Sequence, residues 1–460
     1  MGRMGRLSIT GRAAAVGLGG ALALVGCREA GRSAPPTARR PHVVLLSLDT
    51  TRVDHLGCYG YARPTSPHLD RLAAESVVYT HAVATSSWTL PSHASLFTGK
   101  LTTSHGANYD PEGPLGLADV IGGPREWVRY RARPLPETER TLAEILRDAG
   151  YATGAVVGGP WLKRPFGLAQ GFDYYDDDHI TTTDGRRAES VTDAALRWVE
   201  RSPRRDLFLF LNYYDPHGPY APPEPFLSRF LPPGARPSEG IPKGEELRAR
   251  YDAEVLYMDH HIGRLLDGLR RAGIYDDALI LVAADHGELL GEQGRLGHGQ
   301  HLTEAEIHIP FFVKHPRGRE APRRVEGAVQ LTDVVPMVAR TIGWPAPPGI
   351  QGGVPPSTGH PIVAEVYPLP FDSAEGDWRA LFDGPWKFLW NSKGKHALYD
   401  LARDPEERQN LAGRETARAQ RMAGLLDKYL ASLPRPGAAG PVRELDAATR
   451  EALKALGYVR

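Results

Sequence analysis

Cysteine is scarce in this sequence, and net charge is absent. The 460 residues include two cysteines, Cys27 and Cys58, and 55 basic side chains balance 55 acidic ones. One of the two, Cys27, is a candidate lipidation site, so no internal disulfide can form and a disulfide-based fold is excluded. A chain without an overall basic field has no electrostatic reason to bind nucleic acid, so we expect no nucleic-acid partner. At 41% hydrophobic residues, the chain can bury one large core.

The apolar stretch near the N-terminus, Ala13–Ala23, is too short to span a bilayer. It follows three arginines and leads into Leu24-Val25-Gly26-Cys27, which resembles a bacterial lipobox. Residues 1–26 therefore read as a lipoprotein signal peptide with Cys27 as the lipidated residue. The alternative is a generic signal peptide followed by an incidental cysteine. Residues 27–40 carry no pattern and are expected to form a tether.

A lipid on Cys27 would attach a folded domain to a membrane through the anchor only. The next residue is Arg28, where an aspartate would have favoured retention at the inner membrane. We therefore expect an exported lipoprotein of the bacterial cell envelope, at the outer membrane or facing the periplasm.

From residue 41 on, buried-strand patterns alternate with helical ones. Strands are expected at 42–48, 77–84, 152–157, 207–211, 278–283 and 309–313, and helices at 67–75, 142–149, 189–201 and 245–271. This alternation predicts an α/β fold, with a mainly parallel central sheet flanked by helices, over residues 41–350. Residues 351–460 instead show short aromatic strands and one helix, which predicts a small α+β subdomain with antiparallel strands. Two Pro- and Gly-rich insertions, 109–140 and 219–243, are expected to be surface loops.

The stretch Ser87–Gly99 follows one of these strands. Pro91 fits the first position of a helix that Gly99 would end, which places Thr89 or Leu90 just before the helix. The Thr89 hydroxyl would then face unpaired N–H groups at the positive end of a helix dipole, where a tetrahedral anion can bind. The alternative is that Thr89 is only a helix cap.

Polar residues follow two other strands that are expected to be central. Asp49 comes directly after one strand, and Asp285 and His286 follow the other. Because ligands bind beyond the carboxyl ends of strands in open α/β sheets, these three side chains form a candidate divalent-metal site. Taken separately, each aspartate could be a helix cap and the histidine a solvated loop residue.

Three more histidines lie in loops after strands: His217 follows the strand at 207–211, and His298 and His301 lie in a Gly-rich loop. Histidines there could donate to a bound oxyanion or protonate a leaving group. The alternative is that these side chains are exposed by chance.

These residues resemble the sulfatase branch of the alkaline phosphatase superfamily. The matching blocks are Val43–Tyr61, Thr89–Gly99, Tyr214–His217, Ala284–Glu288, Leu398–Leu401, Asp404–Glu406, Asn410–Leu411 and Leu456–Tyr458. The resemblance covers roughly residues 41–460 and implies an alkaline-phosphatase-like fold. It also implies that Asp49, Thr89, Asp285 and His286 bind the metal.

Two residues depart from the sulfatase signature. Thr89 stands where that signature has a cysteine or serine that is oxidised to formylglycine, and His93 stands in place of its arginine. An unmodified threonine resembles the superfamily's phosphoesterases and its phosphoglycerol and phosphoethanolamine transferases. Thr50 occupies the usual place of a second carboxylate, so one metal ion is expected rather than two. We expect Arg52, His93 and His301 to contact the substrate.

The sequence therefore predicts a metal-dependent hydrolase of phosphate or sulfate esters, acting on a small-molecule, glycan or lipid substrate. A divalent ion would activate the Thr89 hydroxyl for in-line attack and a covalent intermediate, with His217 and His298 as further catalytic residues. One histidine with oxygen ligands favours Mn²⁺ or Zn²⁺, and Ca²⁺, usual in the sulfatase branch, is the alternative. Other readings are a transferase acting on an envelope lipid or glycan, and an inactive binding lipoprotein. Substrate identity and oligomeric state are not predicted.

Overall fold

The computed structural model describes residues 40–437, apart from 203–205, 233, 236, 239, 241, 356–358 and 371–374. The expected signal peptide, the lipidation site Cys27 and the closing block Leu456–Tyr458 lie outside the described residues. Within the described residues, no helix has both the length and the hydropathy needed to cross a bilayer.

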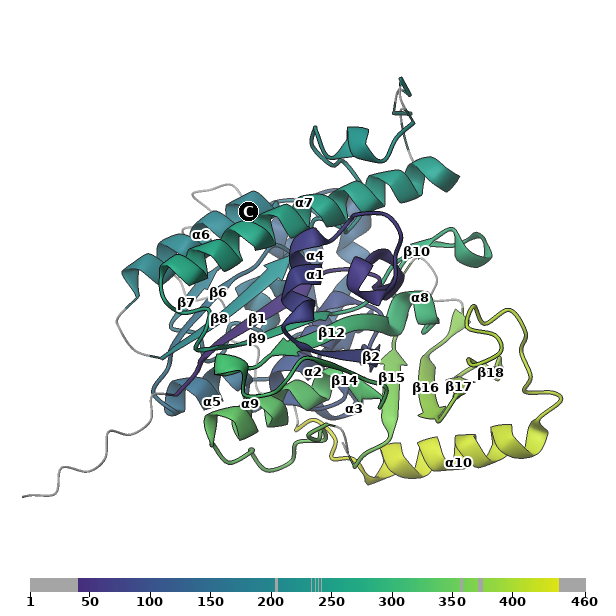
Figure 1. The fold of residues 1–460 in the computed structure, drawn as a ribbon. Coiled ribbons are helices and arrows are strands. Elements are labelled where there is room, and N and C mark those ends of the chain that lie inside the picture. The colour runs from purple at the N-terminus through teal and green to yellow at the C-terminus, as the bar shows by residue number, and fades with distance from the viewer. Residues whose placement is uncertain are drawn as a thin grey trace, which may run out of the picture. The chain divides into compact units, whose positions relative to one another are not determined.

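A nine-stranded sheet forms the centre of the fold (Figure 1). Its strands run in the order β13-β2-β12-β9-β1-β8-β6-β7, and β14 pairs with β2 beside β13. Their bounds are β1 His42–Leu48, β2 Val77–Val83, β6 Ala152–Val156, β7 Tyr174–Asp176, β8 Leu207–Tyr213, β9 Ala278–Ala284, β12 His308–Lys314, β13 Arg323–Val325 and β14 Val329–Gln330. β12 is antiparallel to both of its neighbours, and the other pairs are parallel. The mainly parallel sheet expected from the sequence is confirmed.

Helices cover both faces of this sheet, which is why the central strands read as continuous apolar runs. α1 (Pro67–Ala74), α6 (Ala188–Arg201) and α7 (Gly244–Arg271) lie on one face, and α2 (Thr89–Thr98), α5 (Leu142–Asp148) and α9 (Val334–Ile342) lie on the other (Figure 1). Every residue of β1, β8 and β9 is buried. These three adjacent strands therefore set the position of the loops at their carboxyl ends.

The insertion at 109–140 is not the plain surface loop expected from its prolines and glycines. It contains a three-stranded antiparallel sheet of β3 (Asn108–Tyr109), β4 (Leu115–Gly116) and β5 (Arg131–Arg133), and the short helix α4 (Leu117–Ile121). The strands are two or three residues long, too short for a period-2 pattern to be recognisable. Further short elements lie elsewhere in the chain: α3 (Thr102–His105), the hairpin of β10 (Leu289–Leu290) and β11 (Leu296–Gly297), and α8 (Glu304–Ile307).

The C-terminal subdomain is a four-stranded antiparallel sheet with one helix on it, as expected from the sequence (Figure 1). It consists of β15 (Ile362–Val366), β16 (Trp378–Asp383), β17 (Trp386–Asn391), β18 (Ala397–Asp400) and α10 (Thr416–Ser432). One cross-strand row, Val363, Leu381, Phe388 and Leu398, packs on α10. The next row, Ala364, Ala380, Leu389 and Ala397, belongs to the main core instead. Alternation along each strand thus divides its side chains between two cores.

A buried lysine joins this subdomain to the central fold. The Lys387 ammonium on β17 lies 2.8 Å from carboxylate oxygens of both Glu304 and Glu407, and Lys387 is fully buried. Glu407 in turn accepts a hydrogen bond from the Glu304 backbone N–H at 2.7 Å. Because both carboxylates are themselves largely buried, their charges depend on this one cation for compensation.

We expect Lys387→Met to lower the free energy of unfolding by about 3 kcal/mol, since it leaves two buried carboxylates without a cation. Chemical denaturation measures this loss. Lys428→Met on the exposed side of α10 is the matched control and should change stability by less than about 0.5 kcal/mol. Adding Glu304→Gln and Glu407→Gln to Lys387→Met should restore part of the loss, and an unchanged loss would refute the electrostatic explanation.

Candidate active site

The candidate site lies at the carboxyl ends of the central strands. Asp49 directly follows β1, and Asp285 and His286 directly follow β9, which pairs with β1 in parallel. The Asp49 backbone N–H donates to the Tyr213 carbonyl at 2.8 Å, so pairing with β8 continues to this residue. The β-sheet register therefore brings these side chains to one edge, as the sequence pattern predicted.

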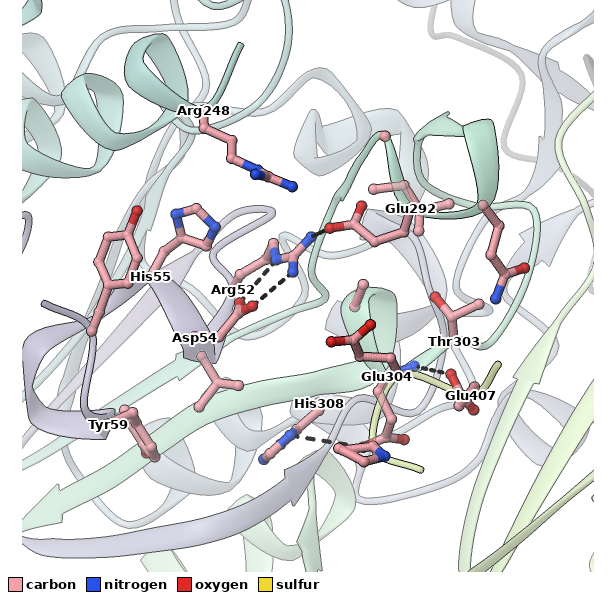
Figure 2. Close-up of a pocket in the computed structure, with 18 of the residues that line it drawn as sticks. Arg52, Asp54, His55, Tyr59, Arg248, Glu292, Thr303, Glu304, His308 and Glu407 are labelled. Atoms are coloured by element: carbon pink, nitrogen blue, oxygen red, sulfur yellow. Dashed lines mark hydrogen bonds and ion pairs between the residues drawn. The ribbon is translucent and has the colours of Figure 1, made fainter. Parts of the chain in front are cut away.

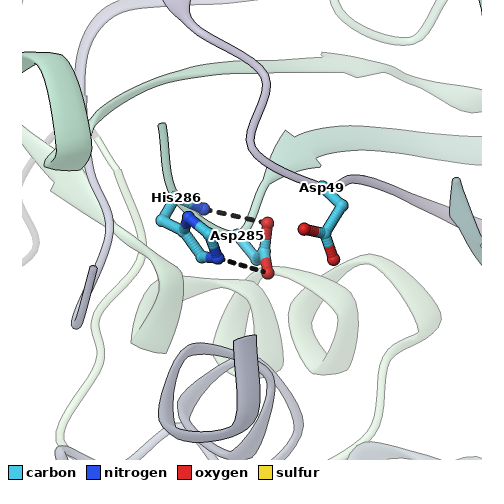
Figure 3. Close-up of side chains that lie close together, drawn as sticks. All are labelled: Asp49, Asp285 and His286. Carbon is cyan, nitrogen blue, oxygen red and sulfur yellow. Dashed lines mark hydrogen bonds and ion pairs between the residues drawn. The ribbon is translucent and has the colours of Figure 1, made fainter. Parts of the chain in front are cut away.

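Asp49, Asp285 and His286 form a cluster that could hold a metal ion (Figure 3). All three are buried, and one ligand atom from each lies within 4.8 Å of the others. Within the described residues, Asp49 Oδ1 and Asp285 Oδ2 are buried and have no hydrogen-bond partner. Unpartnered carboxylate oxygens aimed at a common point, with one imidazole, are the donor set of a divalent cation. The residues present thus fit the metal that the family resemblance implies.

A hydrogen bond to the Gly287 backbone carbonyl sets the tautomer of neutral His286. Its Nδ1 lies 2.9 Å from the Gly287 carbonyl oxygen, so the Nδ1–H donates and the Nε2 lone pair is left toward the cluster. Nε2 lies 3.4 Å from both Asp285 Oδ2 and Thr89 Oγ1. Burial lowers the pKa of His286 well below its usual value, which also favours the neutral ring.

Thr89 begins helix α2, and this corrects the expected helix boundary. The sequence placed Thr89 before the helix and Pro91 at its first position, but the helix starts at Thr89 with Trp88 as its N-cap. Pro91 is tolerated because N–H groups throughout the first turn have no helical acceptor, so its missing donor costs nothing there either. Gly99 ends the helix at φ 67°, as expected. Thr89 is 1% exposed, so its hydroxyl faces the cluster and not solvent.

His93 lies one helical turn after Thr89 and is fully buried. Its Nδ1 lies 2.8 Å from the Thr89 carbonyl oxygen and 3.5 Å from Asp285 Oδ2, and its Nε2 lies 2.8 Å from Ser47 Oγ. Burial lowers its pKa to about 4, so the ring is neutral. These contacts connect α2, β1 and one carboxylate of the candidate metal cluster. The expected substrate contact of His93 stays a prediction.

His217 and His298 line the more exposed side of the site. The His298 ring centroid lies 4.5 Å from that of His286 and 4.9 Å from that of His217. His298 Nδ1 lies 2.9 Å from a Glu288 carboxylate oxygen. Burial alone would lower the pKa of His298, but Glu288 outweighs it, and the pKa is raised. His217 stacks on Tyr214, and burial together with His298 lowers its pKa to about 4.

Arg52 points into a neighbouring cavity of about 950 Å³ (Figure 2). Its guanidinium forms ion pairs with Asp54 and Glu292, both at 2.7 Å, and donates to the Glu288 carbonyl at 3.0 Å. Arg52 thus fastens the loop after β1 to the loop after β9. His301 lies farther along its own loop, with its ring 5.3 Å from the Trp378 ring. The substrate contacts expected for Arg52 and His301 stay predictions.

Residues that fix the ligands were not selected from the sequence. The Asn212 side-chain amide donates to Asp49 Oδ2 at 3.3 Å, and its carbonyl accepts from the Gly159 N–H at 2.9 Å. The Tyr251 hydroxyl on α7 bridges the Thr50 carbonyl and the Arg52 N–H. Asn212 could have been found, because it is the penultimate residue of β8, a strand adjacent to β1. Tyr251 could not, since it lies 201 positions from Thr50 on an ordinary helix pattern.

Two buried carboxylates without a cation should make stability depend on pH. Burial raises the pKa of Asp285 to about 7, and burial followed by the repulsion of Asp285 raises the pKa of Asp49 well above its usual value. The folded state then binds more protons than the unfolded chain above the ordinary carboxyl pKa of ~4. We expect the melting temperature of chelator-treated protein to fall as the pH rises from about 4 to about 7. Excess Mn²⁺ or Zn²⁺ should reverse this trend, because it binds the ionised carboxylates.

Asp49→Asn is the control for this prediction. It removes one of the two repelling charges, so the metal-free variant should melt higher than metal-free wild type at pH 8 and should gain no stability from added ion. Thermal unfolding followed by circular dichroism, with metal content of each sample measured by mass spectrometry, checks both effects. A wild-type melting temperature that is indifferent to pH and metal would contradict the proposed cluster.

Comparisons with known proteins identify the family of the chain. The family model described as Sulfatase matches residues 41–344. An ulvan-active sulfatase of Formosa agariphila is 24% identical over 86% of this chain and 82% of its own, and the multifunctional alkaline phosphatase superfamily protein PehA of Trinickia caryophylli is 25% identical over 81% and 91%.

Solved structures share the fold. The phosphonate monoester hydrolase of Agrobacterium radiobacter superposes with a TM-score of 0.67 at 21% identity, covering 85% of this chain and 95% of that one. A structure in complex with its substrate D-glucosamine-2-N,6-O-disulfate gives a TM-score of 0.69 at 18% identity, with coverages of 85% and 97%. The chain belongs to the sulfatase family of the alkaline phosphatase superfamily and is a hydrolase of the sulfate- and phosphate-ester class.

Proposed function

We propose that this protein hydrolyses phosphate or phosphonate esters, and sulfate esters more slowly, through Thr89 as a covalent nucleophile at a single divalent-metal site. The observation that carries the proposal is the position of the Thr89 hydroxyl, 3.4 Å from His286 Nε2 at the Asp49–Asp285 cluster. A buried hydroxyl at the start of a helix, beside carboxylates that need a cation, fits a nucleophile better than a structural cap, and its hydrogen bond is to His286 Nε2.

The ligand set of the proposed ion consists of Asp49, Asp285, His286 and Thr89. When bound, a divalent cation supplies charge that lowers the pKa of a coordinated hydroxyl and neutralises the substrate oxyanion. Mn²⁺ or Zn²⁺ matches a set with one imidazole, and Ca²⁺ is the alternative. The Asn212 amide and the His286 backbone N–H hold Asp49 and Asp285 in place without adding a competing positive charge.

Thr89 Oγ forms a bond to phosphorus or sulfur as the bond from that atom to the leaving oxygen breaks. The hydroxyl proton of Thr89 leaves through water that enters the site with the substrate, and His298, kept protonated by Glu288, donates a proton to the leaving oxygen. A water molecule then attacks the threonine ester at the same central atom, its oxygen stays on the released phosphate, phosphonate or sulfate, and one of its protons restores the Thr89 hydroxyl. His298 regains its proton from solvent. His217 is neutral and its Nδ1–H donates to the Gly218 carbonyl at 2.6 Å, so its Nε2 accepts a hydrogen bond from a protonated substrate oxygen.

Phosphate or phosphonate esters are the preferred class because Thr89 replaces the residue that sulfatases oxidise. Two similar proteins fit this preference by name, one a phosphonate monoester hydrolase and one a multifunctional member of the superfamily. Formylglycine in sulfatases carries a hydrated aldehyde, whereas Thr89 is a simple alcohol. Its ester is therefore cleaved by attack of water on the phosphorus or sulfur atom.

We also propose export and lipidation at Cys27, on the lipobox-like Leu24–Cys27 sequence. Such a protein would work at the cell envelope, held there by its lipid anchor alone. Cys27→Ala should move the protein from the membrane fraction to the soluble fraction of producing cells, whereas Cys58→Ala should not. Equal fractionation of the Cys27→Ala variant and wild type would overturn the anchor and leave the esterase proposal intact.

Thr89→Val keeps the branched side chain and removes only the hydroxyl. We expect it to lower kcat/KM for aryl phosphate, phosphodiester, phosphonate and sulfate substrates by at least ~10³, while bound metal falls little. Thr89→Ser is the matched control and should retain most activity. Wild-type rates measured with Mn²⁺, Zn²⁺ or Ca²⁺ show which ion supports the highest activity. Activity in Thr89→Val that equals wild type would remove Thr89 from the reaction.

His298→Gln should separate leaving groups by their need for a proton. For an alkyl phosphate, whose alcohol leaves poorly, we expect a loss of 10²–10⁴ in kcat, as is typical when a general acid is removed. For a nitrophenyl ester, which leaves as a stable anion, the loss should be far smaller. Equal losses on both substrates would show that His298 acts in binding and not as the proton donor.

A further inference from the structure

A second cavity lies at the other end of the strands, away from Thr89. It has a volume of about 310 Å³ and lies between α9 and the segment that connects β12 to β13. Leu279, the second residue of β9, lines it, whereas Asp285 follows the last residue of that strand. Leu281, the cavity-lining residue of β9 that is nearer to Asp285, is four residue steps or about 13 Å from it. The cavity is therefore not part of the candidate active site.

The floor of this cavity is apolar. Val313 pairs with Leu281 and Phe311 with Tyr79, so these four side chains share one face of the sheet with Leu279. That face lies beneath α9, whose Met337 also lines the cavity (Figure 1). A volume near the lower end of the roughly 300–1,000 Å³ of ligand pockets suits one short alkyl chain.

The rim of the cavity carries an excess of positive charge. Arg319, Arg323 and Arg340 line it, together with one acidic residue, Glu320. Glu320 pairs with Arg323 at 3.0 Å. The side chains of Arg319 and Arg340 make no hydrogen bond or ion pair with any residue that the structure describes. Two guanidinium groups beside an apolar floor thus have no anion of their own.

Neutral groups complete the rim. The Tyr79 hydroxyl makes no hydrogen bond to the described residues and feels the charges of Glu320, Arg323 and Arg340. It is therefore a free donor beside the guanidinium groups. His315 also lines the cavity, and burial lowers its pKa. The ring is uncharged at neutral pH, so it neither adds to nor cancels the charge of the arginines.

We propose that this cavity binds a single-chain anionic amphiphile, with the alkyl chain on the floor and a carboxylate or phosphate head group between Arg319 and Arg340. Charge complementarity selects this occupant over a neutral apolar one, since two unpaired arginines favour an anion. The apolar floor selects it over a free inorganic anion, since phosphate alone would leave that surface in water. The protein would then bind a lipid at a site separate from the proposed esterase active site.

Isothermal titration calorimetry of the full chain tests this proposal with dodecyl phosphate and laurate, both below their micelle concentrations. We expect both anions to bind and dodecanol to bind at least tenfold more weakly. Inorganic phosphate should give no heat at a concentration at which dodecyl phosphate saturates the protein. Thr89→Val protein serves for these titrations, so that no ester is turned over. Equal binding of dodecanol and dodecyl phosphate, or no binding of either anion, would overturn the proposal.

Single-residue variants test whether the amphiphile binds in this cavity. Arg340→Gln and Arg319→Gln should each weaken dodecyl phosphate about tenfold, the loss of one charge-assisted contact. Met337→Asp should abolish binding by adding a charge to the floor. Arg197→Gln, an exposed arginine of α6 outside the cavity, should change nothing. If these variants bind as wild type does, the amphiphile sits elsewhere and the proposal fails.

Two sources could supply such a ligand: a free fatty acid, or one acyl chain and the phosphate of a membrane lipid. Sedimentation of the Cys27→Ala chain with phosphatidylglycerol vesicles, compared with phosphatidylcholine vesicles, separates them. Capture by the anionic vesicles that Arg340→Gln reduces supports a membrane lipid, and laurate binding without vesicle capture supports the free acid. Either result is independent of esterase activity, because none of these readouts requires turnover.

Discussion

The fold brings two carboxylates together in a place where water cannot solvate them. Asp49 and Asp285 are both buried, at 0% and 1% exposure, and each has an oxygen without a partner among the described residues. Placing like charges together in a low-dielectric interior is costly unless a cation or a proton intervenes. The strands that hold them are fully buried and paired on both sides, so the carboxylates cannot separate. This constraint explains why the surrounding groups are arranged as donors and neutral rings.

The groups nearest these carboxylates supply dipoles and no full positive charge. Asn212 donates an amide hydrogen to Asp49, and the His286 backbone N–H donates to Asp285 at 3.0 Å. His93 and His286 are kept neutral by burial. A lysine or arginine here would pair with the carboxylates and occupy the place of a cation. The cluster thus leaves room for an external charge, and only His298, held by Glu288, keeps a proton at the edge of the site.

The sequence predicts that the candidate metal ligands lie together, because parallel strands impose a simple geometry. Asp49 and Asp285 each follow an apolar run, and parallel β1 and β9 place the ends of such runs side by side. The start of α2 was placed two residues too late, because Pro91 is compatible with more than one position of a first turn. Contacts across long distances, such as Tyr251 to Thr50, leave no local signal in either segment. The small sheet within 109–140 was missed for the opposite reason, since its strands are shorter than any periodicity.

The C-terminal subdomain contributes to the site although it supplies none of the candidate ligands. The Glu365 backbone N–H donates to the Thr85 carbonyl at 2.8 Å, four residues before Thr89, and the Leu369 N–H donates to the Gly299 carbonyl at 3.1 Å, next to His298. Lys387 fixes Glu304 at the start of α8, just after the loop that carries His298 and His301. These three contacts attach the nucleophile segment and the histidine loop to one sheet. The subdomain therefore supports the positions of Thr89 and His298 relative to each other, which the proposed proton transfer requires.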